Sequence, residues 1–66
     1  MQGEVTEFDE PRGLGTIESG GVAYPFHCTQ IADGTRTVEV GTRVTFEVRP
    51  APLGRWEATR IEHAPT

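Results

Sequence analysis

A chain of 66 residues with a formal net charge of −4 has room for a single domain, because chains of this length rarely hold two independent cores. Its one cysteine, Cys28, excludes an internal disulfide. The negative net charge argues against a strong polyanion binder, since phosphate contacts need Lys or Arg and the chain has six arginines and no lysine. No run approaches the about 20 apolar residues that span a bilayer, and residues 1–4 lack the features of a signal peptide. We therefore expect a cytoplasmic monomer that does not bind membranes.

The first half of the chain carries three stretches typical of short β-strands, each ended by turn residues. They are residues 4–8, 14–19 and 22–27. Gly20-Gly21 between the second and third stretches predicts a tight hairpin. In the third, Tyr24 and Phe26 should share one face, with His27 on the other. Pro25 cannot donate to a ladder, so this strand should lie at a sheet edge or carry a bulge.

The second half predicts a loop followed by two more strands. Residues 29–40 form the loop, with a single helical turn at Thr29-Gln30-Ile31. Val44, Phe46 and Val48 alternate with polar residues, so they should point into the core. A second loop over residues 50–54 leads to a fifth strand over residues 56–61.

These elements predict the fold class and the domain boundaries. No segment keeps a helical period for the 10 or so residues that a helix prediction requires. Five short strands without a helix predict an all-β fold, a small antiparallel barrel whose closure removes exposed sheet edges. We expect one domain over residues 1–62 and a short tail over residues 63–66.

A glycine-rich segment, Arg12-Gly13-Leu14-Gly15-Thr16-Ile17, opens the second strand. A basic residue and two closely spaced glycines suit a strand that lets a flat base approach, although the glycines also suit a simple barrel bend. RNA-binding strands of this kind carry aromatic rings where this chain has Leu14 and Thr16. Glu18 occupies the place of the third glycine of a dinucleotide fingerprint, which excludes that motif.

The order of motifs resembles that of the cold-shock domain family over nearly the whole chain. Residues 12–17 match the family's first RNA-binding motif, Lys-Gly-Phe-Gly-Phe-Ile, and residues 24–31 match its second motif, Val-Phe-Val-His-Phe-Ser-x-Ile. The other matching segments of this chain are Gly3-x-Val5-x-x-Phe8-Asp9, residues 38–48, and Ala58 with Ile61. The resemblance implies a five-stranded barrel of the OB type that binds single-stranded RNA or DNA, without a metal or cofactor.

The departures from the family fall on the rings that it stacks on bases. The family's Trp in the first strand is Glu7 here, the two Phe of its first motif are Leu14 and Thr16, and the two Phe of its second motif are Pro25 and Cys28. Each base stack is worth roughly 1–3 kcal/mol. The resemblance therefore implies a degenerate member whose binding is weak and low in sequence specificity.

Seven residues are candidates for the nucleic-acid surface: Phe8, Arg12, Leu14, Thr16, His27, Arg55 and Trp56. Phe8, His27 and Trp56 would stack on bases, and the two arginines would meet the backbone. Each also has a plainer interpretation. Phe8 would be a partly buried strand end, His27 and the arginines solvated side chains, and Trp56 a ring that caps the barrel's end or covers the neighbouring loop.

Other function classes have less support in the sequence. Cys28 and His27, with His63, are too few ligands for a zinc site, and no base and orienting group accompany a nucleophile, so we expect no enzyme. The alternative to nucleic-acid binding is a degenerate barrel that acts as a protein-interaction or regulatory module, which the acidic charge and the replaced rings favour. An SH3-like peptide binder would need a cluster of exposed aromatics that the sequence lacks.

Overall fold

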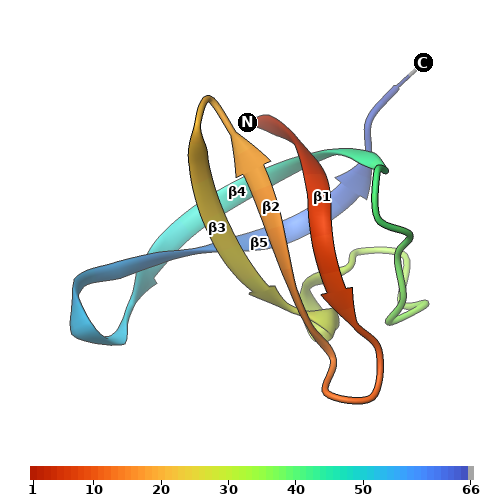
Figure 1. Ribbon diagram of the computed structural model, residues 1–66, viewed down its shortest axis with the longest axis horizontal. Helices are drawn as coiled ribbons and strands as arrows, with labels where there is room; N and C mark the ends of the chain where they lie inside the picture. The colour runs from red at the N-terminus through yellow and green to blue at the C-terminus, as the bar shows by residue number, and fades with distance from the viewer. Residues whose placement is uncertain (66) are drawn as a thin grey trace.

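The computed structural model describes residues 1–65 and consists of five β-strands joined by short turns and one longer loop (Figure 1). The elements are β1 (Gln2–Asp9), β2 (Leu14–Ser19), β3 (Val22–His27), the 3-10 turn η1 (Cys28–Gln30), β4 (Arg43–Ala51), the 3-10 turn η2 (Pro52–Gly54) and β5 (Arg55–His63). No α-helix occurs among these 65 residues. The predicted all-β class is confirmed.

Most differences from the sequence prediction lie at element ends. β2 and β3 have the predicted bounds, whereas the helical turn begins one residue early, at Cys28. β5 runs through His63, which pairs with Val44, and Ala64 N donates to Arg43 O at 3.0 Å. Strand pairing thus enters the segment that we expected to be a tail, whose last residue, Thr66, lies outside the described residues.

The sheet is antiparallel, with the strand order β3-β2-β1-β4-β5. β3 lies at an edge, as Pro25 predicted. The sheet coils until β3 and β5 lie against each other (Figure 1), but no ladder joins them within residues 1–65. The predicted closed barrel is therefore partly open, and one physical reason is that Pro25 has no N–H to offer a second ladder.

Two β-bulges coil the sheet. In β1, Val5 and Glu7 pair with the consecutive residues Ile17 and Thr16, so Thr6 is an extra residue. A second register shift separates two pairs of the β4–β5 ladder, next to Arg60, whose φ of 50° is left-handed. A bulge bends its strand and increases the local twist, which curves a flat sheet into a barrel.

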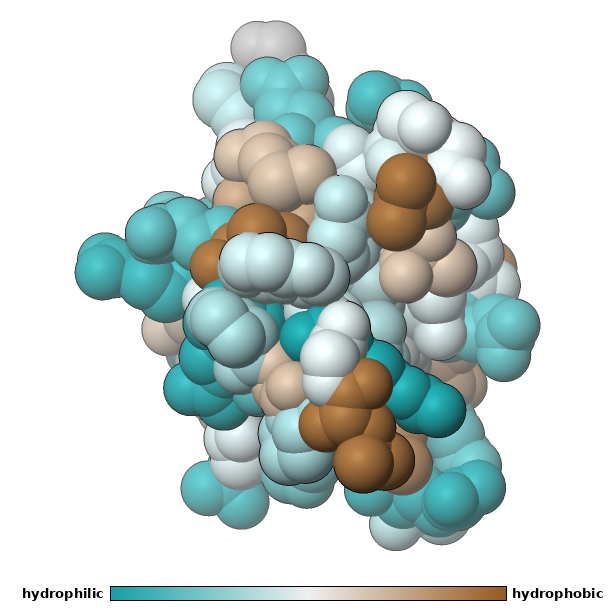
Figure 2. All heavy atoms as spheres, turned by 90° about the vertical axis from the view of Figure 1, so that its left-hand side faces the viewer, coloured by the Kyte–Doolittle hydropathy of each residue, from teal (hydrophilic) through white to brown (hydrophobic). Residues whose placement is uncertain are grey.

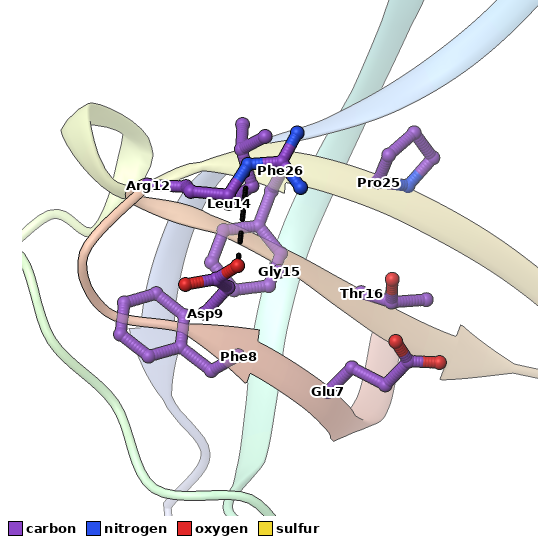
Figure 3. A pocket seen from close by; sticks show the side chains of 9 residues that line it. All are labelled: Glu7, Phe8, Asp9, Arg12, Leu14, Gly15, Thr16, Pro25 and Phe26. Carbon is purple, nitrogen blue, oxygen red and sulfur yellow. Dashed lines mark ion pairs between the residues drawn. The ribbon is translucent and has the colours of Figure 1, made fainter.

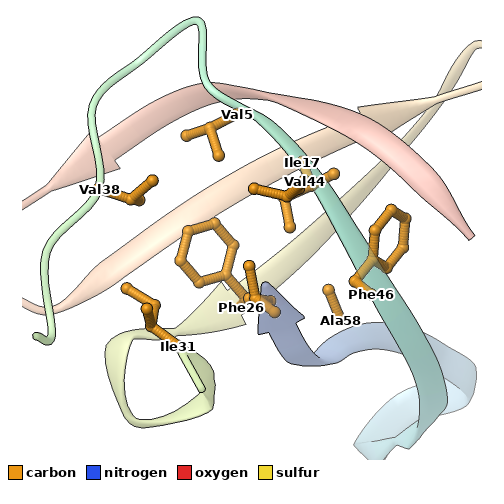
Figure 4. Close-up of a cluster of buried hydrophobic side chains, with 9 residues drawn as sticks. Val5, Ile17, Phe26, Ile31, Val38, Val44, Phe46 and Ala58 are labelled. Atoms are coloured by element: carbon orange, nitrogen blue, oxygen red, sulfur yellow. The ribbon is translucent and has the colours of Figure 1, made fainter. Parts of the chain in front are cut away.

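The coiled sheet encloses one hydrophobic core (Figure 4). Its buried members are Val5, Ile17, Phe26, Ile31, Val38, Val44, Phe46, Ala58 and Ile61. Val44 and Phe46 are buried as predicted, and Val48 is partly buried against the cluster. Gly15 packs beneath the ring of Phe26, where a Cβ would overlap the ring. This glycine therefore serves core packing.

Candidate nucleic-acid interface

The register of β1, β2 and β3 arranges their side chains in cross-strand rows. Two outward rows are Glu7–Thr16–Pro25 and Asp9–Leu14–His27, and the row between them is Phe8–Gly15–Phe26. Because side chains alternate between the faces of a sheet, the middle row points into the barrel, where Phe26 is buried. The two outward rows thus form one continuous face over three strands.

A hollow of about 590 Å³ lies over this face (Figure 3). Its lining residues are Glu7, Phe8, Asp9, Arg12, Leu14, Gly15, Thr16, Pro25 and Phe26. Four of the seven residues predicted from the sequence are among them: Phe8, Arg12, Leu14 and Thr16. The hollow therefore gathers residues from both sides of the turn between β1 and β2.

Phe8 is a partly buried strand end that also lines the hollow. It lies on the inward row, is half-buried, and packs nearly parallel to Phe26, with ring centroids 6.1 Å apart and an interplanar angle of 11°. It also lines the hollow. The ring is thus anchored by the core and offers only its exposed part to a ligand.

The charged lining of the hollow is predominantly acidic. Arg12 Nε lies 4.0 Å from Asp9 Oδ2, and 72% of the Arg12 side chain is exposed. Glu7 forms no ion pair with any residue from 1 to 65. Two carboxylates therefore face one guanidinium, a balance that repels phosphate groups from the middle of the hollow.

His27 has a structural role that the sequence did not reveal. Thr29 N donates to His27 Nδ1 at 3.3 Å, and the Thr29 hydroxyl lies 3.0 Å from the same nitrogen. The side chain thus caps η1 while staying exposed in the outward row of Asp9 and Leu14. It lies outside the lining of the hollow. A histidine two residues before a threonine at the end of a strand is the signal that could have suggested this cap.

Arg55 and Trp56 line a second hollow, of about 340 Å³, between β3 and β5. Trp56 is 53% exposed and pairs with Pro50 across the β4–β5 ladder. Pro25 lines both hollows, which makes it the link between them. The sequence did not single out Pro25 as a site residue, because its contact with both hollows depends on how far the sheet coils.

The surface near the β4–β5 turn carries separate hydrophobic patches between hydrophilic side chains (Figure 2). Leu53, in that turn, is 91% exposed. Among residues 1–65, no three His, Cys, Asp or Glu side chains gather as a metal site would require. The described chain also lacks any helix of the length and apolarity that crossing a membrane demands.

The sequence by itself finds no relative: no protein-family model matches the chain, and no curated protein matches it. Comparison with solved structures finds similar proteins. Drosophila Unr CSD456, a structure of cold-shock domains 4 to 6, superposes with a TM-score of 0.77 and 29% sequence identity. The match covers 97% of this chain and 26% of that one. The chain has the fold of a cold-shock domain. It spans about a quarter of the length of the structure it matches.

The resemblance to cold-shock domains predicted from the motifs is confirmed by this structural similarity, and the missing family-model match fits a degenerate sequence. Three of the five replaced ring positions, Glu7, Thr16 and Pro25, form a single outward row. Leu14, 41% exposed, lies in the next row, and Cys28 lies in η1. The fold resembles that of a cold-shock domain, an OB-type fold of a kind that binds nucleic acid, and three of the positions that differ from the family lie in one row on its surface.

Proposed function

We propose that this domain binds single-stranded RNA or DNA across the outward face of β1, β2 and β3, weakly and with low overall sequence specificity. The observation that carries the proposal is the hollow on that face, which gathers Phe8, Arg12, Leu14 and Thr16. OB-type and cold-shock folds bind single strands on this kind of surface. Such binding keeps RNA unpaired without ATP, because it traps transiently open strands.

The residues divide into base contacts and backbone contacts. Leu14 and the exposed part of Phe8 offer apolar surface to bases, and His27 offers a planar ring at the end of the next row. Arg12 is exposed at the rim, where it can meet a phosphate. Trp56 and Arg55 supply a ring and a charge at the second hollow, which touches the first at Pro25.

The weakness follows from what the face lacks. With rings replaced on both outward rows, several stacks of roughly 1–3 kcal/mol each are lost. Phosphate contacts supply most non-specific affinity, yet Asp9 lies beside Arg12 and Glu7 adds a second negative charge to the hollow. We therefore expect a strand to lay its bases over the face and its phosphates along the rim.

A second candidate function is protein interaction or regulation by a barrel that has given up nucleic acid. The acidic lining of the hollow favours it, because two carboxylates beside an apolar Leu14 also suit a basic protein segment. The strand order and core are the same under both functions. A titration with nucleic acid separates them.

The test is chemical-shift mapping by NMR with a short oligo-pyrimidine strand at low salt. Binding on the proposed face shifts the amide signals of Phe8, residues 12–16 and His27, and leaves those of β4 unchanged. Arg12→Glu should weaken the shifts. Arg49→Glu, a matched charge reversal on β4 outside both hollows, should leave them unchanged. An unchanged spectrum at millimolar strand refutes nucleic-acid binding and favours the protein-interaction candidate.

A further inference from the structure

One outward row combines a carboxylate, a hydroxyl and a flat aliphatic ring. Glu7, Thr16 and Pro25 are Cα partners across β1, β2 and β3, and all three line the first hollow. The carboxylate of Glu7 lies beside Thr16 at one end of this hollow, while Asp9 and Arg12 lie toward the other end (Figure 3). The row thus presents two acceptor oxygens, one hydroxyl group and one apolar surface in a small area.

The carboxylate of Glu7 differs from its acidic neighbours on β1 in having no cation beside it. Asp9 pairs with Arg12 at 4.0 Å, and Glu4 pairs with Arg43 at 4.0 Å, but no ion pair with Glu7 exists in the described part of the chain. Glu7 is exposed and lines the hollow, so its carboxylate is accessible to a ligand. Since a carboxylate only accepts hydrogen bonds, the complementary ligand group must carry N–H donors.

Guanine is the base whose Watson–Crick edge matches two adjacent acceptors. Its N1–H and N2–H donate side by side, next to the acceptor O6. Adenine, cytosine, thymine and uracil each place an acceptor beside a donor on that edge, so one lone pair would oppose a carboxylate oxygen. Unstacked bases of single strands are read on this edge by hydrogen bonds and by stacking. A carboxylate that binds this edge through both oxygens therefore favours guanine.

We propose that the row Glu7–Thr16–Pro25 is a guanine subsite. Glu7 accepts hydrogen bonds from N1–H and N2–H, the hydroxyl of Thr16 donates to O6, and the purine ring rests on Pro25. The inference depends on the proposed binding of single strands and adds a preference at one base position. Glu7 is its specificity-determining residue, in place of the ring that the family stacks on a base there.

The experiment uses the full chain and DNA hexamers of the form TTTXTT, with guanine, inosine, adenine, cytosine or thymine at X. Dissociation constants are measured at low salt by fluorescence anisotropy. The guanine hexamer should bind about fivefold or more tightly than the thymine hexamer, the lower end of the discrimination that a bidentate pair provides. Inosine lacks the N2 amino group and should fall between the two.

Two variants assign the preference to one carboxylate. Glu7→Gln replaces one acceptor by a donor, so it should remove the guanine advantage, while the thymine hexamer binds at least as tightly because a negative charge is gone. Glu18→Gln makes the same charge change at an exposed position of β2, on the same outward face but outside the hollow's lining. This control should keep the guanine advantage.

The outcomes separate this inference from the function on which it depends. If the hexamers bind but guanine gives no advantage, or if Glu7→Gln retains it, the guanine subsite is wrong and single-strand binding stands. If no hexamer binds at millimolar concentration, both proposals fail. A guanine advantage that Glu7→Gln abolishes and Glu18→Gln preserves supports the subsite.

Discussion

Glu7 and Thr16 are direct partners across β1 and β2, so two departures from the family that lie nine positions apart in the sequence meet as neighbours on the surface. Pro25 extends the same line onto β3. The loss of aromatic character is thus concentrated in one row. The inward row beside it holds Phe8 and Phe26, whose rings pack against each other, so the departures in this row lie on the surface and not in the core.

The first prediction concerns restored rings. Leu14→Phe combined with Thr16→Phe returns one ring to each outward row, so we expect single-strand binding to strengthen by roughly 2 kcal/mol or more, from two regained stacks. The measurement is the dissociation constant for an oligo-pyrimidine strand. Val40→Phe adds a ring at an exposed loop position outside the lining of both hollows and should leave affinity unchanged. A folded double variant with unimproved affinity would show that the face is no stacking platform.

The second prediction concerns the core. Phe46 is buried and packs against Tyr24, with ring centroids 5.6 Å apart, so Phe46→Ala should lower the free energy of unfolding by about 3–5 kcal/mol. For a small domain this is most of its stability. Urea denaturation measures the loss, and Val40→Ala, at an exposed position, should stay within about 0.5 kcal/mol of the original. A loss below 1 kcal/mol for Phe46→Ala would contradict the core assignment.

The third prediction concerns Gly15, whose absent side chain makes room for the ring of Phe26. Gly15→Ala places a methyl group against that ring and 2.9 Å from the carbonyl oxygen of Glu7. Overpacking of this kind typically costs about 1–3 kcal/mol, which thermal unfolding would detect. Thr16→Ala, at the next position but on the outward row, should change stability by less than about 1 kcal/mol. Equal effects of the two substitutions would contradict the packing described for Gly15.

The fourth prediction concerns salt. Arg12 and Arg55 line the two hollows, whereas Arg60 is paired with Glu47 at 3.2 Å. For single strands the slope of log K against log salt is about −0.7 per neutralised phosphate, so the contacts of Arg12 and Arg55 predict roughly −1.4, and a third contact, if a phosphate displaces Glu47 from Arg60, predicts roughly −2.1. Arg12→Glu should reduce the affinity for single strands and flatten the slope, because it removes one phosphate contact and adds a negative charge. A slope steeper than about −4 requires six or more phosphates and would move the binding face elsewhere.

The fifth prediction concerns pH. Thr35 N and the Thr35 hydroxyl both donate to Asp33 Oδ1, at 3.0 and 2.8 Å, and these hydrogen bonds lower the pKa of Asp33 below its ordinary value. A lowered carboxyl pKa contributes stability above the unfolded-state pKa, and that contribution is lost as pH falls through the folded-state pKa. Titration of the carboxyl by NMR checks the direction. In Thr35→Ala the pKa of Asp33 should return toward its ordinary value.

The alternating patterns located the strands because each has one buried face, and Pro25 placed β3 at an edge because proline limits pairing. The bulge at Thr6 was not predicted. Val5 and Phe8 are three residues apart, a spacing that a regular strand would place on opposite faces, and the extra residue between them returns both to the interior. The three-residue spacing of Val5 and Phe8 was therefore the sequence signal from which the bulge at Thr6 could have been predicted.

The candidate site was only partly accessible from the sequence. Phe8, Arg12, Leu14 and Thr16 could be gathered because they flank one short turn, so local order was enough. The contact of Pro25 with the hollow of Trp56 joins β3 to β5 through the coiling of the sheet, which no local pattern encodes. The cap that His27 forms on η1 depends on a rotamer and a hydrogen bond rather than on residue type alone.

The open seam between β3 and β5 has a consequence for how copies of this chain behave at high concentration. An unpaired strand edge is a template for another chain, and natural sheets block such edges with proline and charged side chains. Pro25 on β3 and Arg55 on β5 stand on the two strands of the seam. Pro25 leaves the edge of β3 without one N–H donor, which opposes pairing with another chain. We therefore expect an aromatic residue at position 25 to add stacking surface but also to favour edge-to-edge self-association.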